Sequence, residues 1–423
     1  MKLLKVDTIN EAKSKLDKLF SSMEWRSLEL PVNKAVGRYL AEDITPKEDS
    51  PDFARAVVDG YAVRAKDTFG VSDSSPVFLN LVGAVEMGKP ANFELKLGEA
   101  AYIPTGGMLP SGADAVVMVE YTDLLDEKTV SINRSAAPKQ GVMSVGEDFS
   151  KGVMIYKKGH RIKPVDIAVL AAVGQAFVKV FDQPVVSIIS TGDEIVSIIE
   201  TPGPGKVRDV NSFGLSAMVE QTGCKVGGVF LIRDREEELI QTLHAAMGIS
   251  DMVIISGGSS QGAKDYTARV IDAMGKPGVI THGLAMKPGK PTILGVVEDT
   301  HCQCCNRKTL VAGLPGHPVA AIMVYNVIVD WFVKKHFFGR EGQPIVIRAA
   351  LSENVAAGEG RETIIMVSLA RNSTGAFEAQ PVHAKSGAVS QLKDGDGYIM
   401  ISSDSEGLKA GTEVDVVLIQ QMM

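Results

Sequence analysis

Short apolar runs alternate with segments of helical periodicity between residues 184 and 339, and this alternation limits the fold more than any other feature of the chain. Strands that alternate with helices of this length form βαβ units, so we expect a mainly parallel sheet with both faces covered. Ligands of such sheets bind beyond the carboxyl ends of the strands, which points to the loops after Ser190, Ser256 and Gly283. The expected strands are Val185–Ser190, Val226–Ile232, Met252–Ile255, Val279–Gly283, Thr292–Val297 and Thr309–Ala312. Helices are expected from about Asn211 onward and at Glu236–Met247, Asp265–Met274 and Val319–His336.

The flanking segments follow other patterns. Residues 9–40 predict two helices, the second of them short and covering Val36–Leu40. Glycine and proline then punctuate β-branched runs such as Val77–Val82 and Ala115–Val119, before a buried helix at Val165–Val173. The remaining strands, which suit a small β-barrel or sandwich, are Ile345–Leu351, Thr363–Leu369, Gly397–Ile401 and Glu413–Ile419.

The composition is that of an ordinary globular protein. Of the 423 residues, 45% are hydrophobic and 22% are charged, which argues against extended disorder. Lys and Arg number 44 against 51 Asp and Glu, and the resulting net charge of -7 has the wrong sign for a general binder of nucleic acid. Any anionic ligand must therefore be held by local groups.

The N-terminus, the apolar stretches and the cysteines all favour a cytoplasmic protein without a membrane partner. Met1–Leu16 mixes Lys, Asp and Glu and has no apolar core of the kind that a secretory signal needs. Ile167–Phe177 is too short to span a bilayer, and Val319–Val333 is interrupted by polar residues. Three of the four cysteines crowd into Cys302–Cys305, which forms no disulfide framework. A zinc site in that cluster is disfavoured, because zinc ligands normally come as spaced pairs from two segments.

Two carboxylates follow the first strand of the alternating region. In the run Ser190–Glu194, Thr191 and Gly192 stand at the strand end and are followed by Asp193 and Glu194. Glycine permits a tight turn, and carboxylates suit a hard cation such as Mg²⁺. A strand-to-loop turn with solvated acids is the alternative.

A loop rich in glycine and serine, Ser256–Asp265, follows another strand. Gly257 and Gly258 allow the backbone to approach a ligand closely. Ser259 and Ser260, together with the N–H groups at the start of the next helix, make a cradle for an anion such as a phosphate.

The same loop also fits a serine hydrolase. It matches G-x-S-x-G with Ser260 as the nucleophile, His282 or His317 as the base, and Asp265 as the group that orients the base. Residues 261–264 weaken this alternative, because a hydrolase nucleophile stands where its helix begins.

Two lysines lie on a turn stiffened by proline. Lys287 and Lys290 in the run Met286–Pro291 form a fixed positive patch suited to phosphate or an oxyanion. A Walker A reading fails, because Pro291 stands where a magnesium-binding Ser or Thr is needed. A solvated turn is again the alternative. In the Gly313–Pro318 turn, the last proline is explained as a helix start.

Together these runs resemble the MoeA family, the molybdopterin molybdenumtransferases related to the E domain of gephyrin. Each motif is weak alone, whereas their joint order and spacing are specific. The motifs are Asp59-Gly60-Tyr61-Ala62, Pro104-Thr105-Gly106, Ala113–Glu120, Gly146-Glu147-Asp148, Ser190–Glu194, Gly205–Asp209 with Asn211, Ser256-Gly257-Gly258, Lys264-Asp265-Tyr266, Lys287–Pro291 and Leu314-Pro315-Gly316.

The resemblance implies an elongated homodimer of four-domain subunits that combine α/β and β architecture. A helical linker domain would take residues 1–45 and 146–183, with a β-rich domain, residues 46–145, inserted in it. Residues 184–339 would form a three-layer α/β domain with a parallel-rich sheet, like those of the MogA and MoaB proteins. A C-terminal β-barrel would take residues 340–423.

The resemblance also implies a reaction on small-molecule substrates. Molybdate would be inserted into adenylylated molybdopterin with release of AMP, and Mg²⁺ would assist. A molybdopterin adenylyltransferase or a molybdoenzyme is the expected protein partner. A non-catalytic scaffold of the gephyrin type is the alternative, although both lysines and the acidic positions are retained.

Carried over position by position, the family's functional residues fall on definite places in this chain. The catalytic residues would be Asp59, Thr105, Asp148, Glu194, Asp251, Asp265, Lys287, Lys290 and Arg361. Substrate binding would fall to Thr191, Gly192, Ser256, Gly257, Gly258, Ser259, Ser260, Pro315, Gly316 and Ser386. The metal would be held by Asp193, Glu194 and Asp265.

Overall fold

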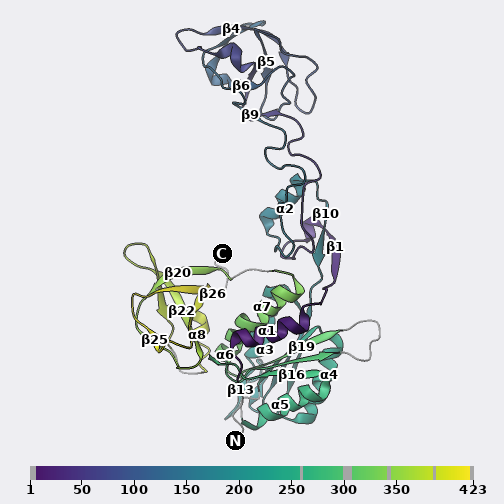
Figure 1. The fold of residues 1–423 in the computed structure, drawn as a ribbon, viewed down its shortest axis with the longest axis vertical. Helices are drawn as coiled ribbons and strands as arrows, with labels where there is room; N and C mark the ends of the chain where they lie inside the picture. Colours follow the sequence, from purple (N-terminus) through teal and green to yellow (C-terminus); the bar gives the residue numbers. More distant parts are fainter. Residues whose placement is uncertain (1–5, 258–260, 299–306, 341–343, 384–386, 420–423) are drawn as a thin grey trace. The chain divides into compact units, whose positions relative to one another are not determined.

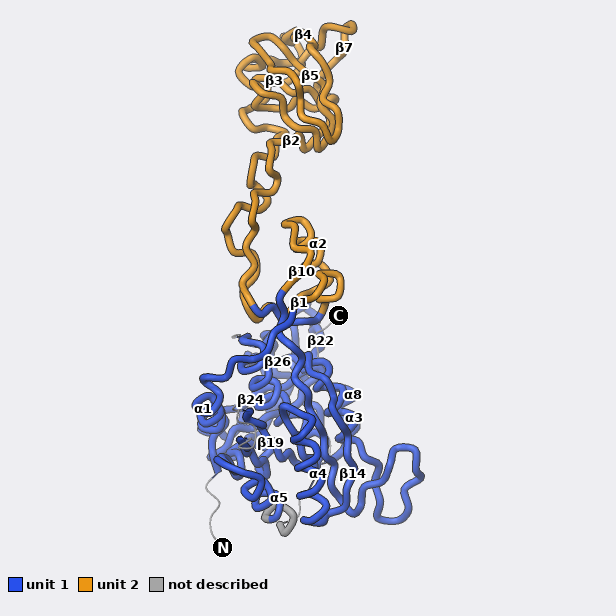
Figure 2. The backbone as a smooth tube through the Cα atoms, turned by 90° about the vertical axis from the view of Figure 1, so that its right-hand side faces the viewer, with its two compact units in different colours: residues 1–28, 37–41, 179–423 blue, residues 29–36, 42–178 orange. Residues whose placement is uncertain are grey.

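The computed structural model describes residues 6–257, 261–298, 307–340, 344–383 and 387–419, without the side chains of residues 261–265. The chain divides into two compact units (Figure 2). The first unit contains residues 1–28, 37–41 and 179–423, and the second contains residues 29–36 and 42–178. Each unit has its own sheets and its own apolar core.

A six-stranded sheet forms the centre of the first unit (Figure 1). Its strand order is β14-β11-β15-β19-β18-β16, and the first four of these strands are parallel. Strand β18 is antiparallel to β19, and β16 is antiparallel to β18, so β16 points in the same direction as the parallel strands. The expected mainly parallel sheet is confirmed. The strands are β11 (Val185–Thr191), β14 (Lys225–Ile232), β15 (Met252–Gly257), β16 (Pro277–His282), β18 (Ile293–Glu298) and β19 (Lys308–Leu314).

Helices cover both faces of this sheet, which makes three layers. Alternate residues of β11 point to opposite faces, so Ile188 packs with the first helix layer and Ile189 with the second. The first layer contains α1 (Ile9–Phe20), α3 (Asn211–Thr222) and the helix that begins with α6 (Pro318–Val324) and continues through η4 (Tyr325–Val329), α7 (Asp330–Phe332) and η5 (Val333–Phe337). The second layer contains α4 (Glu236–Ile249) and α5 (Gln261–Met274).

Five strands near the C-terminus close into a barrel. The ring closes because β22 pairs with both β23 and β24. The strands are β20 (Val346–Leu351), β22 (Glu362–Arg371), β23 (Phe377–Pro381), β24 (Gly397–Ile401) and β26 (Glu413–Leu418). A short strand from the α/β region, β17 (Met286–Lys287), joins the free edge of β22 in parallel. Smaller elements here are β12 (Ile195–Val196), β13 (Val207–Arg208), β21 (Val355–Ala356), β25 (Gly407–Leu408) and α8 (Gln391–Asp394).

The second unit is built around another six-stranded sheet, in the order β6-β3-β5-β4-β8-β7. Its strands are β3 (Gly60–Val63), β4 (Val77–Ala84), β5 (Glu99–Ile103), β6 (Ala115–Met118), β7 (Thr122–Asp126) and β8 (Thr129–Ile132). The expected β-rich region is therefore confirmed. Other elements are β2 (Arg55–Ala56), which pairs with β9 (Val142–Met143), the short helices η2 (Ala65–Thr68) and η3 (Val119–Tyr121), and α2 (Pro164–Ala172).

Three helical expectations were wrong in detail. Helix α5 begins at Gln261, four residues before the expected start, so residues 261–264 belong to the helix and do not count against the hydrolase alternative. Residues 36–40 form no helix, because Gly37 adopts a φ of +81° and Leu40 forms a β-bridge with Val180. The chain there contains instead β1 (Ser27–Pro31) and a single turn, η1 (Val32–Lys34), while β10 (Phe177–Phe181) follows α2. Helix α2 is not a buried helix, since Val165 is 70% exposed and only Asp166 and Leu170 are buried. In the described ranges every helix is too short or too polar to cross a bilayer.

Candidate active site

The register of the central sheet aligns the predicted loops along one edge. Ser190 pairs with Ser256 and Ser256 with Leu314, so β11, β15 and β19 end side by side. Farther along the sheet, His282 at the end of β16 pairs with Ile293 at the start of β18. We call this border the carboxyl edge. It gathers Thr191, Gly192, Asp193, Glu194, Ser256, Gly257, Pro315 and Gly316, and the segment with Lys287 and Lys290 leaves the sheet there.

Asp234 fixes the loop after β11. The hydroxyl of Thr191 donates a hydrogen bond to Oδ1 of Asp234, and the Tyr266 hydroxyl donates to the same oxygen at 3.2 Å. The backbone N–H of Asp234 donates to Oδ1 of Asp193 at 3.4 Å. Burial raises the pKa of Tyr266, so its hydroxyl stays protonated as a donor. Asp234 was not among the predicted residues. It follows β14 at the same edge, and ligands of parallel sheets bind beyond the carboxyl ends of the strands, so its position could have indicated it.

Two of the three expected metal ligands lie at the surface of this loop. Asp193 and Glu194 are exposed, and a Cβ on Gly192 would lie 3.0 Å from Oε2 of Glu194, so that carboxylate folds back over the turn. Among the described residues, no three His, Cys, Asp or Glu side chains are grouped closely enough to hold a metal ion. The side chain of Asp265, the third expected ligand, lies outside the described residues. Mg²⁺ usually keeps several waters and needs only one or two carboxylates, so this pair still suits it.

Gly257 is required by the sheet itself. Its φ is +134°, and a Cβ at this position would lie 2.0 Å from the carbonyl oxygen of Thr191. The sequence attributed this glycine to the close approach of a ligand, whereas the structure shows that the neighbouring strand already demands it. Gly258, Ser259 and Ser260 lie outside the described residues.

Asn211 connects the end of β15 with the turn that follows β19. Its side-chain Nδ2 donates to Oγ of Ser256 at 2.7 Å and to the carbonyl oxygen of Gly316 at 2.8 Å. Both contacts come from the first residue of α3, which starts at the carboxyl edge. The predicted residues Ser256 and Gly316 are therefore held together by a third group.

The barrel contributes a cation beside the lysine turn. Met286 pairs with Glu362 and Lys287 with Thr363, so Arg361 lies one residue before the paired stretch. Arg361 is a bend residue directly before β22, and its guanidinium lies against Gly358. Lys287 and Lys290 are exposed, and Nε of Arg361 is buried with no hydrogen-bond partner in the described part of the chain.

Gly387, the residue after the predicted Ser386, also lies near this edge. Ser386 itself lies outside the described residues. A Cβ on its neighbour Gly387 would lie 3.8 Å from Nε2 of His317, which follows Gly316 directly. The barrel therefore contacts the turn after β19 as well as the lysine segment.

The second unit brings two of its three predicted residues together. Oδ1 of Asp59 accepts hydrogen bonds from the Thr105 backbone N–H at 2.7 Å and from the Thr105 hydroxyl at 3.0 Å. Asp148 is exposed, and its backbone N–H donates to the carbonyl oxygen of Ser50 at 3.1 Å. No hydrogen bond in the described ranges joins Asp148 to the Asp59 and Thr105 pair.

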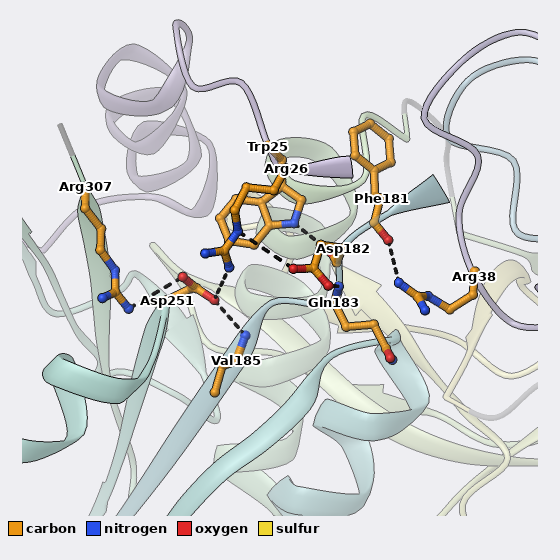
Figure 3. Close-up of polar contacts among 9 residues, drawn as sticks. All are labelled: Trp25, Arg26, Arg38, Phe181, Asp182, Gln183, Val185, Asp251 and Arg307. Atoms are coloured by element: carbon orange, nitrogen blue, oxygen red, sulfur yellow. Dashed lines mark hydrogen bonds and ion pairs between the residues drawn. The ribbon is translucent and has the colours of Figure 1, made fainter. Parts of the chain in front are cut away.

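Asp251 lies at the opposite edge of the central sheet (Figure 3). It precedes β15 and is therefore about 17 Å of extended chain away from Ser256. Its carboxylate is only 6% exposed, lies between Arg26 at 3.3 Å and Arg307 at 3.5 Å, and accepts a hydrogen bond from the Val185 backbone N–H at 2.8 Å. The structure does not bring Asp251 together with the other predicted residues of this unit.

Three family models match successive parts of the chain. The MoeA N-terminal region (domain I and II) matches residues 7–174, and a probable molybdopterin binding domain matches residues 187–335. The MoeA C-terminal region (domain IV) matches residues 348–419.

Similar proteins are matched over nearly their full length. A molybdopterin molybdenumtransferase of Staphylococcus aureus is 31% identical over 97% of this chain and 95% of its own. A solved MoeA protein from Pyrococcus horikoshii is 37% identical, with a TM-score of 0.77 over 99% of this chain and all of its own. A second solved MoeA protein from Pyrococcus horikoshii OT3 is 30% identical, with a TM-score of 0.81 over 98% of this chain and all of its own.

Proposed function

The chain belongs to the MoeA family of molybdopterin molybdenumtransferases and acts in molybdenum cofactor biosynthesis, and from this premise we propose that the carboxyl edge is where molybdate is inserted into adenylylated molybdopterin with release of AMP. The support is chemical. The substrates carry phosphates and a tetrahedral oxyanion, and this edge offers hydroxyl donors, three cations and two carboxylates within a protein of net charge -7.

Lys287, Lys290 and Arg361 hold molybdate in this proposal. The observation that carries it is the pairing of β17 with β22, because this pairing brings the start of the barrel strand, which Arg361 precedes directly, next to Lys287. The ion pairs found among the described residues involve other cations, so these three have no carboxylate partner there and can bind an anion. Arginine offers several N–H donors in a rigid arrangement, which suits the oxygens of an oxyanion.

Adenylylated molybdopterin is bound by the loops after β11, β15 and β19. We assign the phosphates to the backbone and hydroxyl donors of Ser256, Gly257, Gly258, Ser259 and Ser260, and further contacts to Thr191, Gly192, Pro315, Gly316 and Ser386. The start of α5 supports this assignment, since backbone N–H groups at a helix N-terminus favour anions.

Asp193, Glu194 and Asp265 would hold Mg²⁺. A bound Mg²⁺ would neutralise charge on the substrate phosphates as AMP leaves. Within this chain, the bond from the Asp234 N–H to Asp193 fixes one carboxylate, and the Thr191 hydroxyl fixes Asp234 in turn. The loop is therefore ordered before any ligand binds.

Further parts of the proposal come from the family resemblance. Asp59, Thr105, Asp148 and Asp251 keep a proposed role in the reaction, which for Asp251 is the positioning of strand ends. We propose a cytoplasmic homodimer, the division of the chain into four domains at about residues 46, 146, 184 and 340, and delivery to or from a molybdopterin adenylyltransferase or a molybdoenzyme.

Release of AMP tests the proposed function. The purified protein is incubated with adenylylated molybdopterin, Mg²⁺ and either molybdate or tungstate, and AMP is followed over time. AMP release that needs an oxyanion and is abolished by chelation of Mg²⁺ is expected. If neither oxyanion supports release, the proposed reaction is wrong.

The two alternatives from the sequence are not favoured. A serine hydrolase that uses Ser260 would not explain similarity to molybdenumtransferases over nearly the whole chain. A purely scaffolding protein would not need the cations of the carboxyl edge. Fluorophosphonate labelling of Ser260 would revive the hydrolase.

A further inference from the structure

We infer that Asn211 is a positioning residue for the reaction: its amide joins the end of β15 to the turn after β19 and sets the orientation of the Ser256 hydroxyl. The inference rests on the proposed function, because it assumes that substrate binds at the carboxyl edge. Both donors of the Asn211 amide are used on protein groups, so in this proposal the residue acts through Ser256 and Gly316.

The amide of Asn211 is fully used as a donor. A side-chain amide has two N–H donors, and here one points to Ser256 at 2.7 Å and the other to the Gly316 carbonyl oxygen at 2.8 Å. Ser256 lies at the end of β15, where it pairs with Leu314 of the neighbouring strand β19, and Gly316 follows β19. One side chain therefore fixes the spacing between the end of β15 and the turn after β19.

The bond also determines what the Ser256 hydroxyl can do. A serine hydroxyl has one proton to donate, and because the oxygen already accepts from Asn211, that proton must point elsewhere. Ser256 is completely buried, and no protein acceptor for its proton is found within the described ranges. The bond from Asn211 therefore orients the Ser256 hydroxyl at the end of β15.

The segment of chain that carries Asn211 is itself held in place by hydrogen bonds. Asp209, two residues earlier, accepts hydrogen bonds from the Ser190 hydroxyl at 3.1 Å and from the Ser212 backbone N–H at 3.1 Å, as well as from the Ser212 hydroxyl. Asp209, Ser190 and Ser212 are all buried. The start of α3 is thus attached to the end of β11, and Asn211 extends this attachment to β15 and β19. Such a fixed support places binding groups before the ligand arrives.

Variants of Asn211 and Ser256 test the inference in the full-length protein. N211A removes both hydrogen bonds, and N211D replaces the two donors with acceptors. S256A removes the hydroxyl and keeps the bond to Gly316. We expect N211A and S256A each to lower kcat/KM for AMP release by about 10- to 100-fold. N211D should lose more, because a carboxylate would face the Gly316 carbonyl oxygen.

N326D is the matched control. The Asn326 amide also donates to a carbonyl oxygen, that of Ile322 at 2.9 Å, but this bond lies within its own helix, so the activity of N326D should equal that of the parent.

The double variant separates positioning from simple stabilisation. If Asn211 acts through Ser256, N211A/S256A should be no slower than N211A alone, and thermal midpoints should not follow the activity losses. Additive losses would overturn the inference, as would wild-type kcat/KM in N211A, or activity that falls only in step with the melting temperature. Equilibrium binding of adenylylated molybdopterin without molybdate gives a second measurement. If wild-type protein releases no AMP, the proposed function fails. If it does and N211A matches it, only the role of Asn211 fails.

Discussion

Asp59 and Thr105 lie 46 positions apart in the chain, yet one carboxylate oxygen of Asp59 accepts both the backbone N–H and the hydroxyl of Thr105. The first of these bonds lowers the pKa of Asp59 most, and the hydroxyl bond lowers it further. The carboxylate is exposed to solvent, and the two bonds favour its ionised form further. Gly60 allows this turn, because a Cβ there would lie 2.0 Å from the Val117 carbonyl oxygen.

Removal of the Thr105 hydroxyl should raise the pKa of Asp59. In Thr105→Val the backbone bond remains, so we expect a partial rise toward the ordinary value of 3.8. The lowered pKa stabilises the folded state at pH values above the unfolded-state pKa of Asp59. This stabilisation is lost as the pH falls through the folded-state pKa, and in the variant it should be smaller and lost at a higher pH. An NMR titration of the Asp59 carboxyl measures the shift. Thr122→Val, which removes a hydroxyl bonded to the Val119 carbonyl, is the control, and an unchanged Asp59 pKa in Thr105→Val contradicts the argument.

The cations of the carboxyl edge should determine affinity for molybdate. Lys287→Gln and Arg361→Lys should each raise the KM for molybdate by about tenfold or more, because a lysine cannot reproduce the donor arrangement of arginine. Steady-state AMP release at varied molybdate measures the effect. Lys225→Gln, an exposed lysine on β14, serves as the control. Equal KM values in all three variants would remove this set of residues from the oxyanion site.

The Asp251 cluster should affect stability more than turnover. Asp251→Asn weakens two ion pairs and changes the acceptor for the Val185 N–H, so a loss of roughly 3 kcal/mol in unfolding free energy is expected. Urea denaturation measures the loss. Asp182→Asn is a milder control, since that carboxylate is more exposed and lies 3.8 Å from Arg26. A variant that is as stable as the parent but inactive would instead place Asp251 in the chemistry.

Gly257 should not tolerate a side chain. In Gly257→Ala the new Cβ meets the Thr191 carbonyl oxygen, and the ends of β11 and β15 must separate, at a cost of at least about 2 kcal/mol. We expect lower stability together with weaker substrate binding. The control is Gly248→Ala in α4, where no atom lies within 4 Å of the new Cβ. A stable, fully active Gly257→Ala would show that the strand ends can shift freely.

The sequence predicted the central sheet well and the site only in part. Apolar runs such as Val185–Ser190 identified the strands, since parallel strands buried on both faces are continuous in hydrophobicity. Strand β23 was missed because Phe377–Pro381 contains Glu, Gln and Pro and depends on its barrel neighbours. The pairing of Lys287 with Thr363 was also beyond a reading of local pattern, as it joins distant segments. Asp251 was carried over from the family by position alone, yet it precedes β15 and lies at the other end of that strand from Ser256.

The pairing of β17 with β22 can form only after the chain has been synthesised as far as β22. Met286 and Lys287 leave the ribosome before β18, β19 and the helix that begins with α6. Their partner strand, β22, is made only after that helix. On the proposed assignment, a nascent chain has the lysines but not the arginine fork. Under this proposal, molybdate binds at the complete site only after synthesis has passed β22, so an incomplete chain does not bind it in this way.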